Sequence, residues 1–386
     1  MNEIRNTKYE SRVTSHGPRF GFTLVELVVA IGIMAVVILF AGNVFKTSIS
    51  SYRIAAAQAE IMQKFRAITD QLNNDFRGLR KDAPLFIWFQ IDPNNNRFDQ
   101  IMFFADGDFQ STQIYNVNTS PGPYSGYIVP QPSGSPVVSN LARIYYSQAR
   151  SIDPLSNLFN DPYNLIPANR ILSRRQHLFI ANPSSGSQYV QFPTFDSSGS
   201  LFVDPIQNNW LEHDTNSLSQ WQAATQSSTN VNNIITGCFG TDAYYSNNRP
   251  DVNLTDASTL HLLMAQKVGN FSVQWGYYHL DTSVPPNRYV YWWPSNDPDG
   301  SGDITDSDFI KMMNVNGLSA PAFGVCFNVA APSVSGWFTP NNVAGPYFTG
   351  TPGFYPVALK FTFTLYDSRG VFKDGQTFTH IVYLGD

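Results

Sequence analysis

One segment of the chain concentrates side chains that could bind a metal ion. Between residues 297 and 308, oxygen-bearing residues stand at the first, third, fifth, seventh, ninth and twelfth positions: Asp297, Asp299, Ser301, Asp303, Thr305 and Asp308. Gly302, at the sixth position, allows a sharp turn. Calcium takes about six to eight oxygen ligands, from carboxylates, carbonyls and water. The spacing therefore predicts a calcium site, with Asp303 binding through its carbonyl and Thr305 directly or through water.

This pattern resembles an EF-hand or dockerin-type loop, with two departures. Asp308 stands where the EF-hand has a glutamate, which shortens the reach of the bidentate ligand. The entering helix is absent from the prediction, since residues 289–293 read as a strand and Pro294 follows, while 309–314 could form a short exiting helix. Bound calcium would brace this connection and take no part in catalysis. The alternative is an Asp/Gly-rich surface turn without metal.

Enzyme chemistry finds little support elsewhere in the sequence. P-loop, HExxH, GxSxG and CxxC motifs are absent, and no carboxylate pair is spaced to act as acid and base. His261, His279 and His380 fall in strand-like segments, where histidines are usually structural. We expect a protein that is not an enzyme; a membrane-anchored hydrolase with its residues hidden in inserted loops is the remaining enzymatic alternative. Cys238 and Cys326 fit no zinc or redox spacing, and a disulfide or two separate thiols stay equally open.

Composition points to an extracytoplasmic β-rich chain. Charged residues make up 14% of the 386 residues, below the roughly 25% of an average soluble domain, and aromatic residues make up another 14%. The abundant Gly, Pro, Asn and Ser favour short strands joined by long turns. A net charge of -5, with no cluster of Lys and Arg, argues against nucleic acid as a partner.

A single carboxylate, Glu26, interrupts a long apolar stretch at residues 22–42. At about 1.5 Å per residue this stretch is long enough to cross a bilayer as a helix. The polar leader, residues 1–21, has more basic than acidic residues, so it should stay in the cytoplasm while the chain after Gly42 faces outward. A secretory signal would have a small-residue cleavage site after the apolar stretch; here a Gly–Phe junction precedes it instead.

Residues 21–27, GFTLVEL, resemble the cleavage and methylation motif of type IV pilins and of the pseudopilins of type II secretion. The resemblance implies that a prepilin peptidase cuts after Gly21, that Phe22 becomes the methylated N-terminus, and that Glu26 is needed for filament assembly with other pilins or pseudopilins. A carboxylate in an apolar helix is costly without a partner, and the new amine of Phe22, in the same or a neighbouring subunit, would provide one. The alternative is a boundary residue that reaches the membrane surface.

A second helical segment, residues 43–83, should continue the membrane helix as an amphipathic spine that ends near Pro84. Its apolar residues recur mostly three or four apart: Phe45, Ile49, Tyr52, Ala56, Ala59, Met62, Phe65, Leu72, Phe76 and Leu79. A coiled coil is the alternative. We prefer packing on the chain's own β-domain, because Ala56 and Ala59 allow close approach to a sheet.

Residues 84–386 should form one antiparallel β-domain. Nine strands are expected, at residues 85–91, 100–105, 141–147, 171–180, 260–268, 271–279, 289–293, 357–366 and 377–384. The last two alternate apolar and polar residues, and the turn at Asp367–Gly370 predicts a hairpin. Residues 106–140 and 181–256 are rich in turn formers and are expected to be loop insertions, the second with one short helix near Trp210–Trp221. The predicted class is α+β, with a helical spine packed on an antiparallel sheet, as in pilins.

Four groups of residues resemble the J-class minor pseudopilins of type II secretion: LNNDFR at 72–77; ARIYY at 142–146 with LSRR at 172–175; FSVQWGYY at 271–278 with Trp292 and Trp293; and PVALKFTFTL at 356–365. The resemblance implies a subunit of an inner-membrane-anchored filament, with its soluble domain in the periplasm or on the cell exterior, that drives the export of a protein substrate. The insertions make this domain longer than is usual for that class. A minor pilin of a type IV pilus with a surface-binding role is the alternative.

Overall fold

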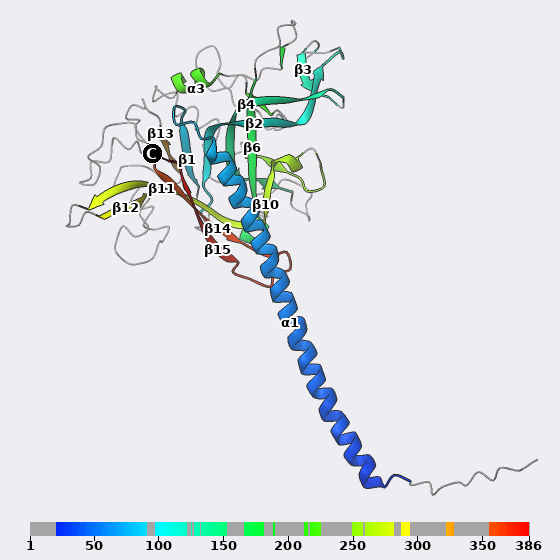
Figure 1. Ribbon diagram of the computed structural model, residues 1–386. Coiled ribbons are helices and arrows are strands. Elements are labelled where there is room, and N and C mark those ends of the chain that lie inside the picture. Colours follow the sequence, from blue (N-terminus) through cyan, green and yellow to red (C-terminus); the bar gives the residue numbers. More distant parts are fainter. Residues whose placement is uncertain are drawn as a thin grey trace, which may run out of the picture. The chain divides into compact units, whose positions relative to one another are not determined.

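The computed structural model describes residues 21–90, 97–121, 125, 127–131, 133–152, 166–180, 188–189, 212–214, 217–224, 249–257, 259–281, 287–293, 322–327 and 355–385. The chain divides into two compact units, Met1–Ala56 and Ala57–Asp386. Helix α1 (Leu24–Arg77), labelled in Figure 1, contributes residues to both.

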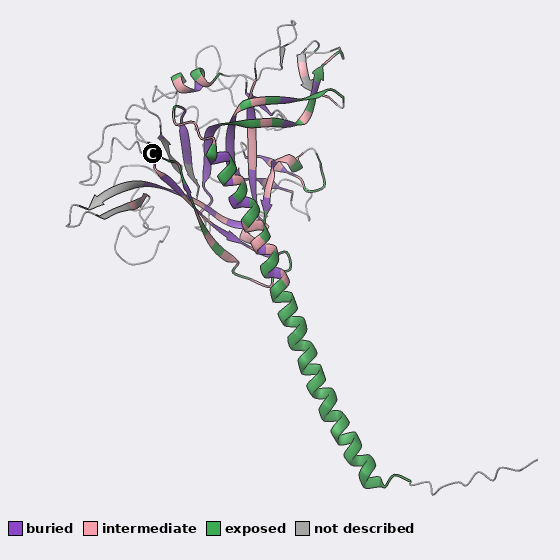
Figure 2. Ribbon diagram, viewed as in Figure 1, coloured by how far each residue is buried: buried purple, intermediate pink, exposed green. Residues whose placement is uncertain are grey.

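The first unit contains the apolar part of α1. Among the described residues, α1 is the one helix that is long and apolar enough to cross a membrane by length and composition. Every side chain from Gly21 to Ala55 is exposed, including the large apolar residues from Phe22 to Phe45 (Figure 2). An apolar surface of this extent is stable in lipid or against other apolar helices, not in water.

The second unit contains two main antiparallel sheets, as an α+β fold requires. The larger has the order β10-β6-β4-β2-β1-β13, with β3, β7 and β8 paired off this path. Its strands are β1 (Leu85–Gln90), β2 (Gln100–Val117), β3 (Tyr127–Pro130), β4 (Ser135–Gln148), β6 (Ile171–Phe179), β7 (Gln188–Tyr189), β8 (His213–Asp214), β10 (Leu263–Gln266) and β13 (Ala322–Phe327). Two of these pairings, β3 with β7 and β6 with β8, are short and parallel.

The smaller sheet has the order β12-β11-β14-β15. These strands are β11 (Val268–Asp281), β12 (Asn287–Trp293), β14 (Ala358–Leu365) and β15 (Gln376–Tyr383). Short elements complete the unit: β5 (Arg150–Ser151) paired with β9 (Asp251–Val252), the 3₁₀ turns η1 (Pro167–Asn169) and η3 (Leu260–Leu262), and helix α3 (Leu218–Ala224). Buried Asp99 joins the two sheets, because its carboxylate binds Arg97 and accepts the N–H of Val273 at 2.7 Å.

The C-terminal half of α1 packs on both sheets through one apolar seam. Its buried apolar residues are Ala57, Ile61, Ile68, Leu72 and Phe76. The ring of Phe76 stacks on Phe103 of β2 at 4.1 Å and lies 5.5 Å from Phe361 of β14. The predicted contact with the chain's own β-domain is confirmed. The predicted phase was wrong at Ala59, which is exposed, because Ala57 and Ile61 lie on the buried side instead.

The helical spine ends at Arg77, earlier than the predicted limit of residue 83. A side chain at Gly78 would lie 1.8 Å from the carbonyl oxygen of Asp106, so only glycine allows the chain to approach β2 this closely. The approach is fixed by a hydrogen bond from the N–H of Asp106 to the oxygen of Gly78 at 2.7 Å and by a bridge between Leu79 and Ala105. Pairing with a strand therefore ends the helix before Pro84 does.

The predicted loop insertion at residues 106–140 is largely a β-ribbon. Strand β2 continues to Val117 and β4 begins at Ser135, with pairing that includes Phe109 opposite Ser139 and Tyr115 opposite Ser135. Two register shifts interrupt this pairing where the polar residues gather. The prediction of a loop was wrong because Ser, Gln and Asp, which are common in turns, are also tolerated on the exposed faces of a ribbon.

Much of the other predicted insertion, residues 181–256, lies outside the described residues. Helix α3 begins at Leu218, later than the short helix expected near residue 210. Its Trp221 is fully buried against Phe104, and the indole N–H donates to Asp214, which also pairs with Arg143 at 2.8 Å. This part of the insertion therefore packs on the larger sheet.

The other strand predictions, apart from the strand at 260–268, are confirmed with shifted ends. The expected strand at 260–268 is instead a 3₁₀ turn followed by β10. Strands β14 and β15 form the predicted antiparallel hairpin, with Phe361 opposite His380. Their connection is longer than the predicted four-residue turn, because it extends from Tyr366 to Gly375, a glycine with φ of 71°.

Candidate functional site

The predicted processing junction lies at the beginning of α1. Gly21 and Phe22 precede the helix, and Phe22 is 89% exposed. A side chain at Gly21 would meet nothing within 4 Å, and Gly21 is absent from the residues with positive φ. The local fold therefore does not require glycine at this position.

Thr23 and Glu26 form a reciprocal cap on the first turn of α1. The Glu26 carboxylate accepts the Thr23 N–H at 2.9 Å and the Thr23 hydroxyl at 3.0 Å. In return the Glu26 N–H donates to the Thr23 hydroxyl oxygen at 3.3 Å. This is the capping-box arrangement, which satisfies N–H groups that the helix itself leaves without partners. The sequence pattern singled out Glu26; the role of Thr23 was missed, although Thr-x-x-Glu is a recognisable signal.

This geometry places a negative charge close to the predicted N-terminus. Cleavage after Gly21 would leave a cationic amine on Phe22, the neighbour of the residue whose N–H Glu26 already accepts. The first turn of a helix also favours a negative charge. The segment can thus offer a carboxylate and an amine side by side, and each can pair within the chain or with another subunit.

A second constellation fastens α1 to the larger sheet. Asp75, which is 3% exposed, receives two parallel hydrogen bonds from the Arg174 guanidinium at 2.7 and 2.8 Å. The hydroxyl of fully buried Tyr146 donates to the same carboxylate, and Gln71 donates from one turn earlier at 2.9 Å. Burial, together with the charge of Asp75, raises the pKa of Tyr146, which therefore stays a neutral donor.

Three of the segments singled out in the sequence contribute to this constellation. Asp75 comes from LNNDFR, Tyr146 from ARIYY and Arg174 from LSRR. The pattern identified the segments but not the contact between them. Burial lowers the pKa of Arg174 and its bonds to Asp75 raise it, with a net rise, so the guanidinium keeps its charge. Such a pair holds a helix at a defined position on a sheet, because a buried charge that loses its partner is strongly unfavourable.

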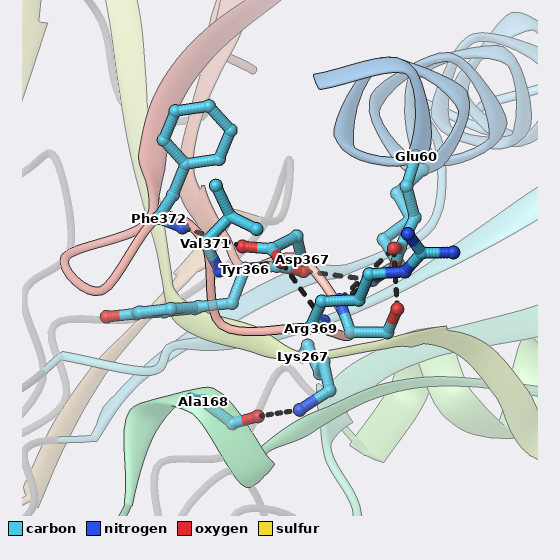
Figure 3. Close-up of polar contacts among 10 residues, drawn as sticks. Glu60, Ala168, Lys267, Tyr366, Asp367, Arg369, Val371 and Phe372 are labelled. Atoms are coloured by element: carbon cyan, nitrogen blue, oxygen red, sulfur yellow. Dashed lines mark hydrogen bonds and ion pairs between the residues drawn. The ribbon is translucent and has the colours of Figure 1, made fainter. Parts of the chain in front are cut away.

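The loop between β14 and β15 is held to α1 by a third group of contacts (Figure 3). Glu60 accepts the Ser368 N–H at 2.9 Å and its hydroxyl at 2.7 Å, and pairs with Lys64 at 2.7 Å. Lys64 also donates to the carbonyl oxygen of Tyr366 at 2.9 Å. Burial alone would raise the pKa of Glu60, but the bonds from Lys64 and Ser368 outweigh it and lower the pKa.

Asp367 organises the same loop from within. Its buried carboxylate accepts the backbone N–H groups of Arg369, Val371 and Phe372 at 2.8 to 3.0 Å. Burial raises the pKa of Asp367, and these three bonds outweigh that effect and lower it. The loop is thereby a defined structure fixed at both Asp367 and Glu60.

The predicted calcium ligands cannot be placed, because residues 294–321 lie outside the described residues. Within the part of the chain that the structure describes, no three His, Cys, Asp or Glu residues are grouped to hold a metal ion. Cys238 also lies outside the described residues, and of Cys326 only the backbone, in β13, is described. The calcium site and the disulfide therefore stay predictions.

Comparison with known protein families gives one match: residues 18–42 fit the prokaryotic N-terminal methylation motif. Comparison with curated proteins finds no significant relative, and comparison with solved structures finds no significant match. The matched residues contain the Gly21–Phe22 junction, Glu26 and the apolar part of α1. The match supports a pilin or pseudopilin type of protein that is processed by a prepilin peptidase, assembles with other pilins and is anchored by one membrane helix.

Proposed function

We propose that this chain is a structural minor pseudopilin, a subunit of a type II secretion-like pseudopilus that drives protein export. The observation that carries the proposal is the methylation motif at the beginning of an exposed apolar helix, whose continuation is built into a β-domain. The motif would direct processing of the N-terminus, the apolar helix would pack in the filament, and the β-domain would form the surface of the subunit. None of these parts calls for catalysis.

Assembly follows from the charges at the beginning of α1. In the membrane the Glu26 carboxylate is costly unless it has a partner, and an apolar helix leaves few candidates. The amine of a processed Phe22 on a neighbouring subunit fits this requirement. Pairing between subunits would exchange the carboxylate's contact with the neutral Thr23 N–H for an ion pair in which both the donor and the acceptor are charged.

Placement in the J class rests on the segment resemblances, and one internal contact supports it. Asp75, Tyr146 and Arg174 belong to three of these segments and meet in one buried network. A shared internal contact explains why the three segments would occur together. A minor pilin of a type IV pilus is the alternative, because it would use the same N-terminal chemistry.

Deletion and complementation in the native host test this proposal. We expect loss of the chain to reduce the amount of exported protein in the medium and to leave surface pili unchanged, with wild-type chain restoring export. Loss of surface pili with normal export would replace the proposal with the pilus alternative. Normal export together with normal piliation would refute both.

A further inference from the structure

A cavity of about 290 Å³ lies in the second unit. Its walls come from β5 and β9 with the residues that follow each, the turn η1, the beginning of β6, and the end of β10 with the residue that follows it. This volume lies near the lower limit of small-ligand pockets, which begin at roughly 300 Å³, so it suits a ligand of amino-acid size.

Among the described residues that line this cavity, Lys267 is the one with a charged side chain. It is also the one described residue other than glycine with a positive φ, at 63°. This left-handed conformation is unfavourable for lysine and nearly free of cost for glycine. Because glycine would fit this backbone conformation better, the presence of lysine here suggests that its side chain has a function.

Contacts on both sides hold Lys267 in place. Its carbonyl oxygen accepts the N–H of Tyr366 at 2.9 Å, and the next N–H, of Val268, donates to the oxygen of Arg170 at 3.1 Å. Its ammonium group donates to the carbonyl oxygen of Ala168 in η1 at 3.3 Å, and Ala168 also lines the cavity (Figure 3). An ammonium has three N–H donors, and this contact uses one of them.

The rest of the lining is divided between neutral polar and aliphatic side chains. The polar residues are Ser151, Asn169, Asn253, Thr255 and Gln266, and the aliphatic ones are Ile152, Ile171, Val252 and Leu254. A single cation with neutral hydrogen-bonding groups suits one carboxylate, and the aliphatic side chains suit a branched hydrocarbon beside it. We propose that this cavity binds an aliphatic carboxylate of about the size of leucine, anchored by Lys267.

Calorimetric titration of the detergent-solubilised full chain tests the site. The probes are N-acetyl-L-leucine and its uncharged amide, together with the tripeptide Gly-Gly-Leu as acid and as C-terminal amide. The acids should bind at least about tenfold more tightly than the amides, because the amides lack the charge that Lys267 would pair with. Tighter binding of the tripeptide acid would identify a protein C-terminus as the source of the carboxylate, and tighter binding of acetyl-leucine a small molecule.

Variants distinguish a Lys267 that binds the carboxylate from a Lys267 that only stabilises the fold. Lys267→Met should weaken binding of the acids by about tenfold or more, whereas Lys373→Met, at an exposed lysine of the β14–β15 loop, should not. Lys267→Asn should raise the melting temperature by about 2 °C, since asparagine tolerates positive φ better, and should also abolish binding. Absence of binding by every acid, or equal binding by wild type and Lys267→Met, would overturn the proposal.

Discussion

Glu26 has two possible partners, and the difference between them decides its role. Within the chain it completes a cap with Thr23, a contact that many soluble helices have. In an assembly of subunits it would pair with the amine that processing creates at Phe22. The cap alone gives no reason for a membrane helix to keep a carboxylate, because a glutamine at the same position could complete the capping box without a charge.

Glu26→Ala should abolish filament incorporation while membrane insertion and cleavage persist, because insertion depends on the apolar helix and cleavage on the Gly21–Phe22 junction. Thr23→Ala is the matched control, since it removes the two hydroxyl contacts of the cap and keeps the charge. We expect a much smaller loss of incorporation for Thr23→Ala, measured by the fraction of the subunit in sheared or cross-linked filaments. Equal effects of the two variants would mean that Glu26 acts only as a cap.

Asp75→Ala should lower the free energy of unfolding by about 3 kcal/mol, because it leaves the largely buried Arg174 without its bidentate partner. Asp70→Ala, at an exposed position of the same helix, should change it by no more than about 0.5 kcal/mol. Urea unfolding followed by tryptophan fluorescence measures both. A loss for Asp75→Ala no greater than that for Asp70→Ala would contradict the role of this pair.

These two carboxylates show what residue patterns can predict. Glu26 stands out in the sequence because its neighbours are all apolar, so its unusual environment is visible locally. Asp75 lies in an ordinary polar stretch, and its partners Tyr146 and Arg174 are distant in the chain. The contact depends on the register of β4 against β6, which no local pattern sets.

At the level of elements, the sequence predicted that α1 is a helix packed on the β-domain, but the prediction of its buried face and of its end was wrong. Its apolar periodicity identified a packed helix, but several adjacent alanines left the phase open between Ala56, Ala57 and Ala59. Its end depended on Gly78 approaching β2, a tertiary contact. The ribbon of β2 and β4 was missed for the related reason that turn-forming residues are also acceptable on exposed strands.

The β14–β15 loop should loosen in acid. The pKa of Asp367 is lowered in the folded chain, so its contribution to stability is present above the pKa of the unfolded chain, about 3.9, and is lost as the pH falls through the lower folded value. Asp367→Asn should therefore flatten the dependence of the unfolding midpoint on pH below about pH 4. Asp374→Asn, at an exposed carboxylate of the same loop, is the control. An acid profile for Asp367→Asn that matches the wild type would refute this assignment.

The predicted calcium loop at residues 297–308 gives a separate expectation. At a free calcium concentration of about 100 times the dissociation constant, binding to the folded chain would add about 2.7 kcal/mol of stability. The melting temperature should therefore rise with calcium and fall with chelator in the wild type. Asp297→Ala with Asp299→Ala should remove this difference. Equal melting temperatures of the wild type in calcium and in chelator would eliminate the site.

At the scale of the whole molecule, a membrane-type helix, a spine and a β-domain are joined in one chain. Two units are described, and the chain passes from one to the other within α1, so the apolar helix and the domain it carries are covalently continuous. The fold class was predictable because long periodic segments and alternating strands are local signals. The order of strands in the sheets was not, because it depends on long-range pairing such as β1 with β13.

Mass spectrometry of the N-terminus of the chain, extracted from membranes of the native host, tests the central claim most directly. The account predicts a chain that begins at Phe22 with a methylated amine, and an uncut precursor when Gly21 is replaced by a bulky residue. Gly21 has no contact that the fold requires, so such a variant should still fold. An intact Met1, or a terminus created by cleavage after Gly42, would contradict the assignment of this chain to the pilin-type proteins.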